Sequence, residues 1–159
     1  AYQLWGIDIA RAAVRAAARR DKKSQFAVAS TYRLPVLAES LHAVCRIFAP
    51  GDAAELRRVL RPDGLLYSIS PGPQHLHQLK VLCYETPRPH KSEETPAGFA
   101  RIDQQQIGYS LHLENAAIGH LLHMTPYYWH LNPEAQQRVL ALDALHLQTD
   151  FMLRVYQKI

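Results

Sequence analysis

The sequence predicts an α/β fold built on a mostly parallel sheet, and three observations support this. Short apolar runs recur through the first half of the chain, and segments of helical composition separate several of them. A further apolar run closes the chain after two more helical segments. Strands that alternate with helices of about ten residues are typical of a parallel sheet with helices on both faces.

The first half alternates strands and helices. Apolar runs predict strands at residues 4–9, 26–29, 43–48 and 65–70, and the intervening composition predicts helices at 11–20 and 53–60. Asp52 is suited to cap the second helix. The sequence RPDG at 61–64 predicts a tight turn before the fourth strand.

The second half is organised differently. Helices are expected at 74–84, 116–123 and 133–142, and strands within 99–113 and at 145–157. The segment 86–98 is rich in proline and charge, so we expect a mobile loop. A strand, then helices, then a last strand suits the antiparallel end of a mixed sheet, and no second domain is indicated.

Composition places the chain among ordinary globular proteins. It has 159 residues, 48% of them hydrophobic and 20% charged, which is enough for one domain with a real core. No run of eighteen apolar residues is available for a membrane-spanning helix. Cys45 and Cys83 lie in apolar sequence without paired spacing, so we expect reduced core thiols and a cytoplasmic protein. Two cysteines also exclude a four-cysteine zinc site.

The charge pattern leaves two interpretations open. The formal net charge of +4 is compatible with RNA binding without requiring it. Arg11, Arg15 and Arg19 recur every four residues on one predicted helix face, which suits either phosphate binding or, more commonly, a solvated face. Histidine pairs such as His75 and His77 lack accompanying carboxylates or cysteines, so no metal site is predicted.

Two sets of motifs carry a family resemblance. The sequence VLRPDGLL at 59–66 resembles the turn before the fifth strand of class I methyltransferases. The stretches VASTYRLPV (28–36), RIFAP (46–50), SPGPQHLHQLK (70–80), MTPYYW (124–129) and QTDF (148–151) follow in order. Together they resemble the bacterial 23S ribosomal RNA guanine-N1-methyltransferases, in a branch that modifies hairpins and includes macrolide-resistance enzymes. The resemblance covers essentially the whole chain. It implies S-adenosylmethionine as cofactor and a 23S ribosomal RNA hairpin as partner.

Asp8 is the residue whose position alone suggests chemistry. An acid at the tip of a parallel strand can accept hydrogen bonds from ribose hydroxyls, although Asp8 also precedes a helix that it could cap. The resemblance implies further roles, by residue. It places Asp8, Ile9, Ala29, Ser30 and His75 at the cofactor. It places Arg46 and Pro50 in the catalytic loop. It places Phe48, Tyr127 and Trp129 at the target base.

Methylation at guanine N1 would need alignment and removal of one proton. The sulfonium methyl group is already activated, so the enzyme mainly aligns donor and acceptor. The proton on N1 must be removed, and His75 is one candidate base, but it could equally contact the cofactor or pack at a helix start. Aromatic residues in MTPYYW could stack on an extruded base, which would stabilise binding by about 1–3 kcal/mol. The alternative is that they are core residues.

The chain also departs from the family pattern. The resemblance predicts an amino-terminal zinc ribbon, a first strand and a glycine-rich cofactor loop, but residues 1–159 contain no G-x-G sequence. His42 stands where aspartate is common, and Asp63 where a second glycine is usual. We therefore expect residues 1–159 to be a carboxy-terminal part of the catalytic domain that lacks the first strand, with impaired cofactor binding and possible pairing as a homodimer. A non-catalytic RNA-binding or assembly module, or a small-molecule methyltransferase, remain alternatives.

Overall fold

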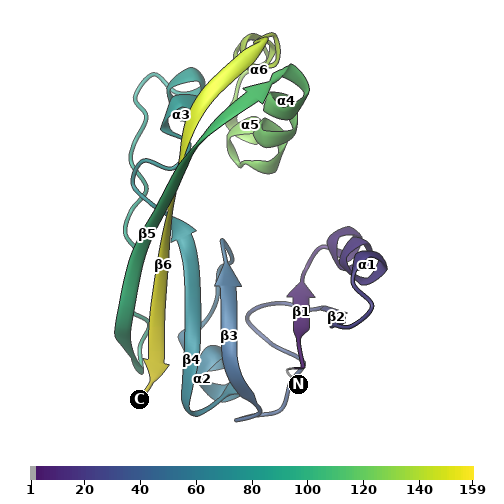
Figure 1. Ribbon diagram of the computed structural model, residues 1–159, viewed down its shortest axis with the longest axis vertical. Helices are drawn as coiled ribbons and strands as arrows, with labels where there is room; N and C mark the ends of the chain where they lie inside the picture. The colour runs from purple at the N-terminus through teal and green to yellow at the C-terminus, as the bar shows by residue number, and fades with distance from the viewer. Residues whose placement is uncertain (1–2) are drawn as a thin grey trace. The chain divides into compact units, whose positions relative to one another are not determined.

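The computed structural model describes residues 3–159 and has the predicted alternation in its first half (Figure 1). The elements are β1 (Trp5–Asp8), α1 (Arg11–Arg20), β2 (Gln25–Val28), β3 (Leu41–Ile47), α2 (Ala53–Val59) and β4 (Leu60–Pro71). The second half contains α3 (His77–Cys83), β5 (Phe99–Glu114), α4 (Asn115–Met124), α5 (Tyr127–His130), α6 (Pro133–Leu140) and β6 (Ala144–Lys158). The predicted loop at 86–98 has neither helix nor strand.

The strands form two sheets. β1 and β2 pair in parallel, from Trp5 opposite Gln25 to Asp8 opposite Val28. The other four strands follow the order β3-β4-β6-β5. In Figure 1, β6 runs opposite to both of its neighbours, whereas β3 and β4 run the same way. The mostly parallel arrangement with an antiparallel last strand is therefore confirmed.

Local sequence explains where α2 begins, whereas β4 begins earlier than the sequence predicted. The Asp52 side chain accepts hydrogen bonds from the backbone N–H groups of Ala54 and Glu55, so it caps α2 as predicted. β4 already begins at Leu60, before the expected turn at 61–64. Asp63 adopts a left-handed backbone with φ of 60°, so the predicted turn appears as an irregularity inside this long strand.

The chain divides into two compact units, each with its own core. The first unit takes in the described residues up to Ser68, together with Thr95–Asp103 and Arg154–Ile159; the second comprises Ile69–Glu94 and Gln104–Leu153. The core of the first unit consists of Leu56, Leu60, Leu66, Phe99 and Tyr156. The core of the second consists of Leu76, Leu79, Ile118, Leu122, Tyr127, Leu131, Ala135, Val139 and Leu147.

The environment of the two cysteines differs from the prediction for one of them. Both are free thiols, but Cys45 is exposed and only Cys83 is half-buried, so the prediction that Cys45 is a core residue is wrong. Cys45 lies on β3, whose side chains there border an open groove rather than packed neighbours. Among residues 3–159, no helix has the length and apolar character needed to cross a membrane.

Candidate functional site

Three of the predicted cofactor residues meet at the carboxyl ends of β1 and β2. The carbonyl of Asp8, the last residue of β1, accepts a hydrogen bond from the backbone N–H of Ala29 at 3.1 Å. Ser30 follows directly, and its hydroxyl accepts from the backbone N–H of Tyr32 at 3.2 Å. Parallel pairing of the two strands thus brings Asp8, Ala29 and Ser30 together, and we call these three residues the rim.

The Asp8 carboxylate is engaged on one side by the chain just before α1, and its predicted role at a ribose stays a prediction. Its Oδ1 atom accepts a hydrogen bond from the backbone N–H of Ala10 at 2.7 Å, so the side chain does steady the start of α1. Within residues 3–159 no donor is assigned to Oδ2, and the residue is exposed. Ile9, the next residue, is 76% exposed. One carboxylate oxygen is therefore directed to the helix while the other can serve a ligand.

Arg46 and the loop after β3 make up the predicted catalytic segment. The Arg46 guanidinium donates to the Ser68 hydroxyl on β4, at 3.0 Å from Nη2 and 3.3 Å from Nε. Burial lowers the pKa of Arg46 from its ordinary value, and Ser68 is itself buried. Phe48 has a left-handed φ of 50° and is half-exposed, so the chain bends sharply just before Pro50. Arg46 therefore ties the end of β3 to β4, and Phe48 keeps an accessible ring.

An apolar groove separates β1 from β3 within the first unit. From the β1 side it is lined by Leu4, Trp5 and Ile7, and from the β3 side by Leu41, Ala43, Val44 and Cys45. Among residues 3–159, β1 pairs only with β2 and β3 pairs only with β4. Each strand bordering the groove therefore keeps an edge without a strand partner among the described residues.

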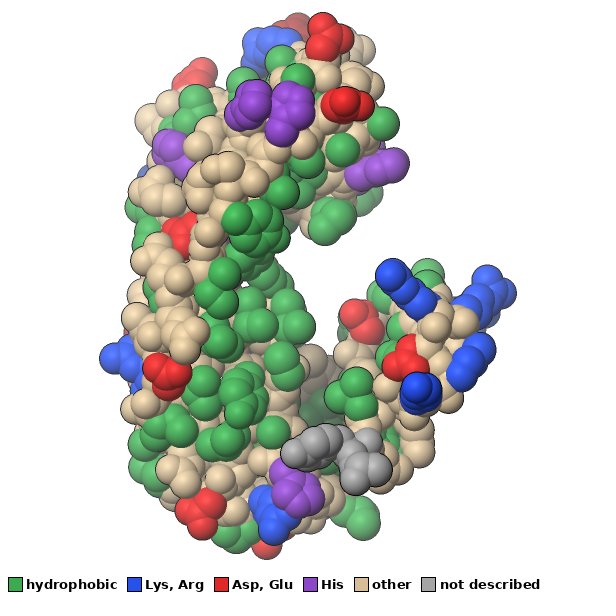
Figure 2. Space-filling view, viewed as in Figure 1, with side chains coloured by type: hydrophobic (Ala, Val, Ile, Leu, Met, Phe, Trp, Pro, Cys, Tyr) green, Lys and Arg blue, Asp and Glu red, His purple; other side chains and the backbone are tan. Residues whose placement is uncertain are grey.

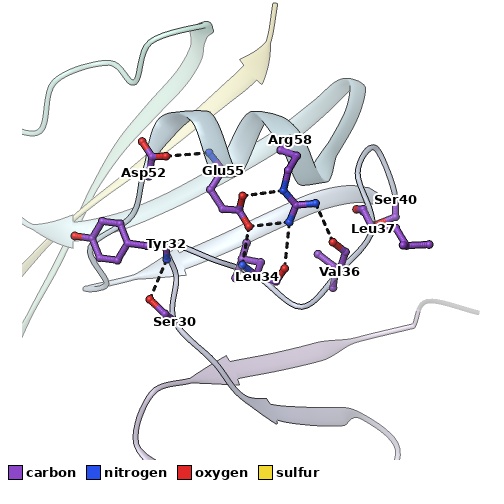
Figure 3. Close-up of polar contacts among 9 residues, drawn as sticks. All are labelled: Ser30, Tyr32, Leu34, Val36, Leu37, Ser40, Asp52, Glu55 and Arg58. Carbon is purple, nitrogen blue, oxygen red and sulfur yellow. Dashed lines mark hydrogen bonds and ion pairs between the residues drawn. The ribbon is translucent and has the colours of Figure 1, made fainter.

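A carboxylate–guanidinium pair on α2 holds the segment that follows the rim (Figure 3). Arg58 donates to both oxygens of Glu55, at 2.8 Å and 2.7 Å. Glu55 Oε1 accepts from the Leu34 N–H at 2.6 Å, while Arg58 donates to the carbonyls of Leu34 at 3.1 Å and Val36 at 3.0 Å. The hydrogen bonds that the Glu55 carboxylate accepts, from Arg58 first and then from Leu34, lower its pKa to about 2. Sequence reasoning missed this pair, although its i, i+3 spacing on a helix is a recognisable pattern.

His75 lies in the second unit, where it is anchored to β6. Its Nδ1 atom accepts a hydrogen bond from the backbone N–H of Asp150 at 3.2 Å, and its ring packs on Phe151 with centroids 4.7 Å apart. The Asp150 carboxylate, also buried, accepts from the Gln74 N–H at 2.9 Å and from the Gln106 amide at 2.8 Å. Asp150 therefore holds the SPGPQHL segment in place. The sequence motif QTDF contained this residue, but nothing in the sequence indicated its role.

The protonation state of His75 bears on whether it can act as a base. Burial lowers the pKa of His75, so the neutral imidazole is favoured near neutral pH. In a neutral ring that accepts at Nδ1, the proton resides on Nε2. The lone pair that a base needs is thus engaged by Asp150. The geometry therefore favours the anchoring role for His75 among the alternatives that the sequence left open.

The two aromatic residues predicted at the target base differ sharply in exposure. Tyr127 is buried, with its ring edge-on to Tyr84, and burial raises its pKa to about 12. Trp129, two residues later in α5, is 77% exposed and packs edge-on against Tyr128. Tyr127 is therefore placed as a core residue in this structure, whereas Trp129 keeps a surface on which a base could stack.

No group of three or more potential metal ligands occurs among residues 3–159.

Solved structures define the class of fold to which this arrangement belongs. A Bacillus halodurans protein that has been assigned as a methyltransferase aligns over 99% of this chain and 83% of its own, with a TM-score of 0.60 and 15% identity. An S-adenosylmethionine-dependent methyltransferase from Methanosarcina mazei aligns over 99% and 82%, with a TM-score of 0.52 and 16% identity. The fold is that of the class I S-adenosylmethionine-dependent methyltransferases.

Sequence relatives narrow the class to one family. The chain is 32% identical over 147 residues to the 23S rRNA (guanine(748)-N(1))-methyltransferase of Streptomyces fradiae, covering 88% of this chain and 52% of that protein. It is 31% identical over 143 residues to a Micromonospora griseorubida protein assigned as a 23S rRNA (guanine-N(1)-)-methyltransferase, covering 86% and 48%. No protein-family model matches. By sequence the chain is similar to 23S rRNA guanine-N1-methyltransferases, and it spans about half the length of these relatives.

Proposed function

We propose that this chain supplies the rim, the catalytic loop and the base-stacking surface of an enzyme that methylates guanine N1 in a hairpin loop of 23S ribosomal RNA. The observation that carries the proposal is the exposed Asp8 carboxylate, set beside Ala29 at the carboxyl end of two parallel strands. In parallel α/β sheets nucleotide ligands bind at this end, and an acid there holds ribose hydroxyls. The named activity of the Streptomyces fradiae relative supplies the substrate.

The residues present fit one part of the methyl donor better than the rest. Asp8 Oδ2 suits a ribose hydroxyl, and the small residues Ala29 and Ser30 leave space for an adenine beside it. No G-x-G sequence is available in the chain to bring backbone N–H groups to the remainder of the donor. We therefore propose that the complete donor site needs one more strand and loop, seated in the groove between β1 and β3, and that residues 1–159 alone bind the donor weakly.

The reaction itself asks for alignment and for one proton transfer. S-adenosylmethionine supplies an electrophilic methyl group: the sulfur–carbon bond breaks as the bond from carbon to guanine N1 forms. The proton on N1 must leave to a base. Because the His75 lone pair is engaged by Asp150, we assign His75 to holding the SPGPQHL segment and not to that proton. In this proposal Arg46 fixes the catalytic loop through Ser68, and Pro50 limits the conformations of that loop.

Guanine N1 is hidden in a duplex, so the base must be looped or flipped out. Trp129 and Phe48 are the aromatic residues predicted at the target base that remain exposed. Stacking on either ring would be worth about 1–3 kcal/mol. Tyr127, being in the core of the second unit, would act by supporting the helix that carries Trp129.

The test uses the chain joined to the part of the Streptomyces fradiae relative that it does not match. With S-adenosylmethionine and a 23S ribosomal RNA transcript, primer extension should stop at one guanine. Asp8→Asn should reduce the rate about 100-fold because it removes the charged acceptor for the ribose, and Asp21→Asn, in the neighbouring turn, should not. A joined protein that binds the transcript but never methylates it would instead support a non-catalytic RNA-binding module.

A further inference from the structure

The positive charge of this chain is concentrated in one short segment. Residues 11–23 hold six of the 18 basic residues and one of the 14 acidic residues, and so carry a net charge of +5. The remainder has 12 basic and 13 acidic residues and a net charge of −1. The overall charge of +4 therefore comes entirely from α1 and the turn after it, which is an asymmetry typical of a surface that meets a polyanion.

The arginines of α1 are positioned as a stripe. Arg11, Arg15 and Arg19 lie on one face, spaced one turn apart, over roughly 12 Å of helix. All three are exposed, and α1 contains no buried residue. No ion pair to any of them is found within residues 3–159. Figure 2 shows Lys and Arg side chains gathered over this helix. We call these three residues the arginine stripe.

The arginine stripe costs helix stability. Arg11 is the first residue of α1, where the helix dipole disfavours a cation, and the first turn contains no acid. Like charges spaced four residues apart also repel. Within the described residues Asp21 forms no ion pair with the stripe; its carboxylate accepts from the Lys23 N–H at 2.7 Å and the Ser24 hydroxyl at 2.6 Å. Arg19, in the last turn, is favourably placed, and the Asp8 carboxylate lies just before the helix, so the cost that remains is the repulsion along the stripe, which a bound polyanion would relieve.

We propose that the arginine stripe binds the phosphodiester backbone of the RNA substrate next to the rim. The guanidinium fork matches phosphate oxygens, and alanines between the arginines leave nothing to obstruct the approach of a strand. Asp8 accepts from Ala10 immediately before α1, so bound RNA would enter beside the rim. The choice of RNA as the polyanion rests on the proposed function; the existence of the site rests on the charge distribution.

An anionic membrane is the competing partner, and the helix argues against it. Interfacial helices bury large apolar side chains opposite their basic face. Apart from its arginines, α1 consists of alanine and Val14, and it has no large aromatic or branched residue that would insert into lipid. The arginine stripe is therefore suited to a ligand that is recognised by charge alone, such as a nucleic acid backbone.

The test measures binding of the 159-residue chain to a fluorescent single-stranded loop hairpin from 23S ribosomal RNA over a range of salt concentrations. Replacing the stripe with Arg11→Gln, Arg15→Gln and Arg19→Gln removes three phosphate contacts. The slope of log affinity against log salt should fall by about 2, and binding should weaken about tenfold. Arg→Lys at the same positions should keep the slope, which shows that loss of charge and not misfolding is responsible.

The matched control removes equal charge elsewhere, with Arg61→Gln, Lys91→Gln and Arg138→Gln, and should leave the slope almost unchanged. Equal losses in both triple variants would overturn the proposal, because net charge alone would then explain binding. So would unchanged RNA binding by the stripe variant together with lost binding to phosphatidylserine vesicles. Because no methylation is measured, the arginine stripe can stand even where the enzymatic proposal fails.

Discussion

Residues 3–55 and residues 56–159 differ in how completely they are packed. No residue in the first region is buried, although it contains β1, α1, β2 and β3. Every buried residue lies in the second region, including both cores. The first region instead contains the exposed Asp8 of the rim, the exposed arginine stripe and the β1 and β3 sides of the apolar groove. The region that we propose to bind the ligands is thus the one without buried residues of its own.

This difference in packing explains which polar side chains hold the loop segments in place. The segment after Ser30 is held from α2 by Glu55 and Arg58, whose side chains are 12% and 39% exposed and which bond to backbone N–H and carbonyl groups. In the second unit the SPGPQHL segment is held by the buried Asp150. Buried hydrogen bonds to a charged group are worth more than exposed ones. The first region would become comparably rigid if the groove between β1 and β3 were filled.

The largest expected effect comes from truncating equivalent apolar side chains in the two regions. Leu122→Ala removes a fully buried side chain from the core of the second unit and should cost about 3 kcal/mol. Ile7→Ala, in β1 beside the groove, should cost less than about 1 kcal/mol, because that side chain is not buried. Urea denaturation of both variants measures this. Equal losses would show that the first region is packed after all.

A second test examines how tightly Asp150 is seated. A Cβ atom at Gly72 would overlap the Asp150 carboxylate, so Gly72→Ala should destabilise the chain by about 2 kcal/mol. Gly119→Ala is the matched control, since its Cβ would meet only Leu140 Cδ2 at 3.4 Å and α4 would gain helix propensity. The midpoint of thermal unfolding should therefore fall for Gly72→Ala and rise for Gly119→Ala. A neutral Gly72→Ala would mean that the anchor is loose.

The reactivity of the two free thiols measures the difference in packing between the two regions. Burial raises the pKa of both thiols, that of Cys83 to about 11, but Cys45 is exposed beside the groove and Cys83 is half-buried. Since the thiolate is the reactive form, Cys45 should be alkylated at least about ten times faster at neutral pH. Mass spectrometry of peptides after timed iodoacetamide treatment gives both rates. Faster reaction at Cys83 would reverse the assignment of open and closed regions.

The smallest effect is a pH dependence from Glu55. Its pKa is lowered in the folded chain from 4.5 to about 2, chiefly by the Arg58 hydrogen bond. A depressed folded pKa gives stability that is present above the unfolded value and is lost as pH falls from about 5 towards 2. Because the Arg58 side chain is 39% exposed, solvent screens the pair and we expect only about 1 kcal/mol. For Glu55→Gln the denaturation midpoint should change less with pH over this range, and an unchanged profile would count against a stabilising role of the Glu55–Arg58 pair.

The sequence was informative where chemistry follows from local pattern. Asp8 was recognisable at the tip of a parallel strand, whereas Ala29 was expected near it only from the family resemblance; the structure brings the two residues together. The cap at Asp52 and the strands themselves follow from short-range composition. Cys45 was mispredicted because apolar neighbours in the sequence do not show that the edge of β3 lacks a partner. Asp150 and Gln106 were missed because the bonds they form join β5, β6 and the segment before α3, which are far apart in the chain. The short helix Tyr127–His130 was also missed, since four residues give too little periodicity.

The central claim is that the rim binds the methyl donor only when the groove between β1 and β3 is filled. Titration calorimetry with S-adenosylmethionine tests it directly, using residues 1–159 alone and joined to the unmatched part of the Streptomyces fradiae relative. We expect no measurable binding by the chain alone and micromolar binding by the joined protein, abolished by Asp8→Ala. Micromolar binding by the chain alone, or binding by the joined protein that Asp8→Ala leaves unchanged, would contradict the account.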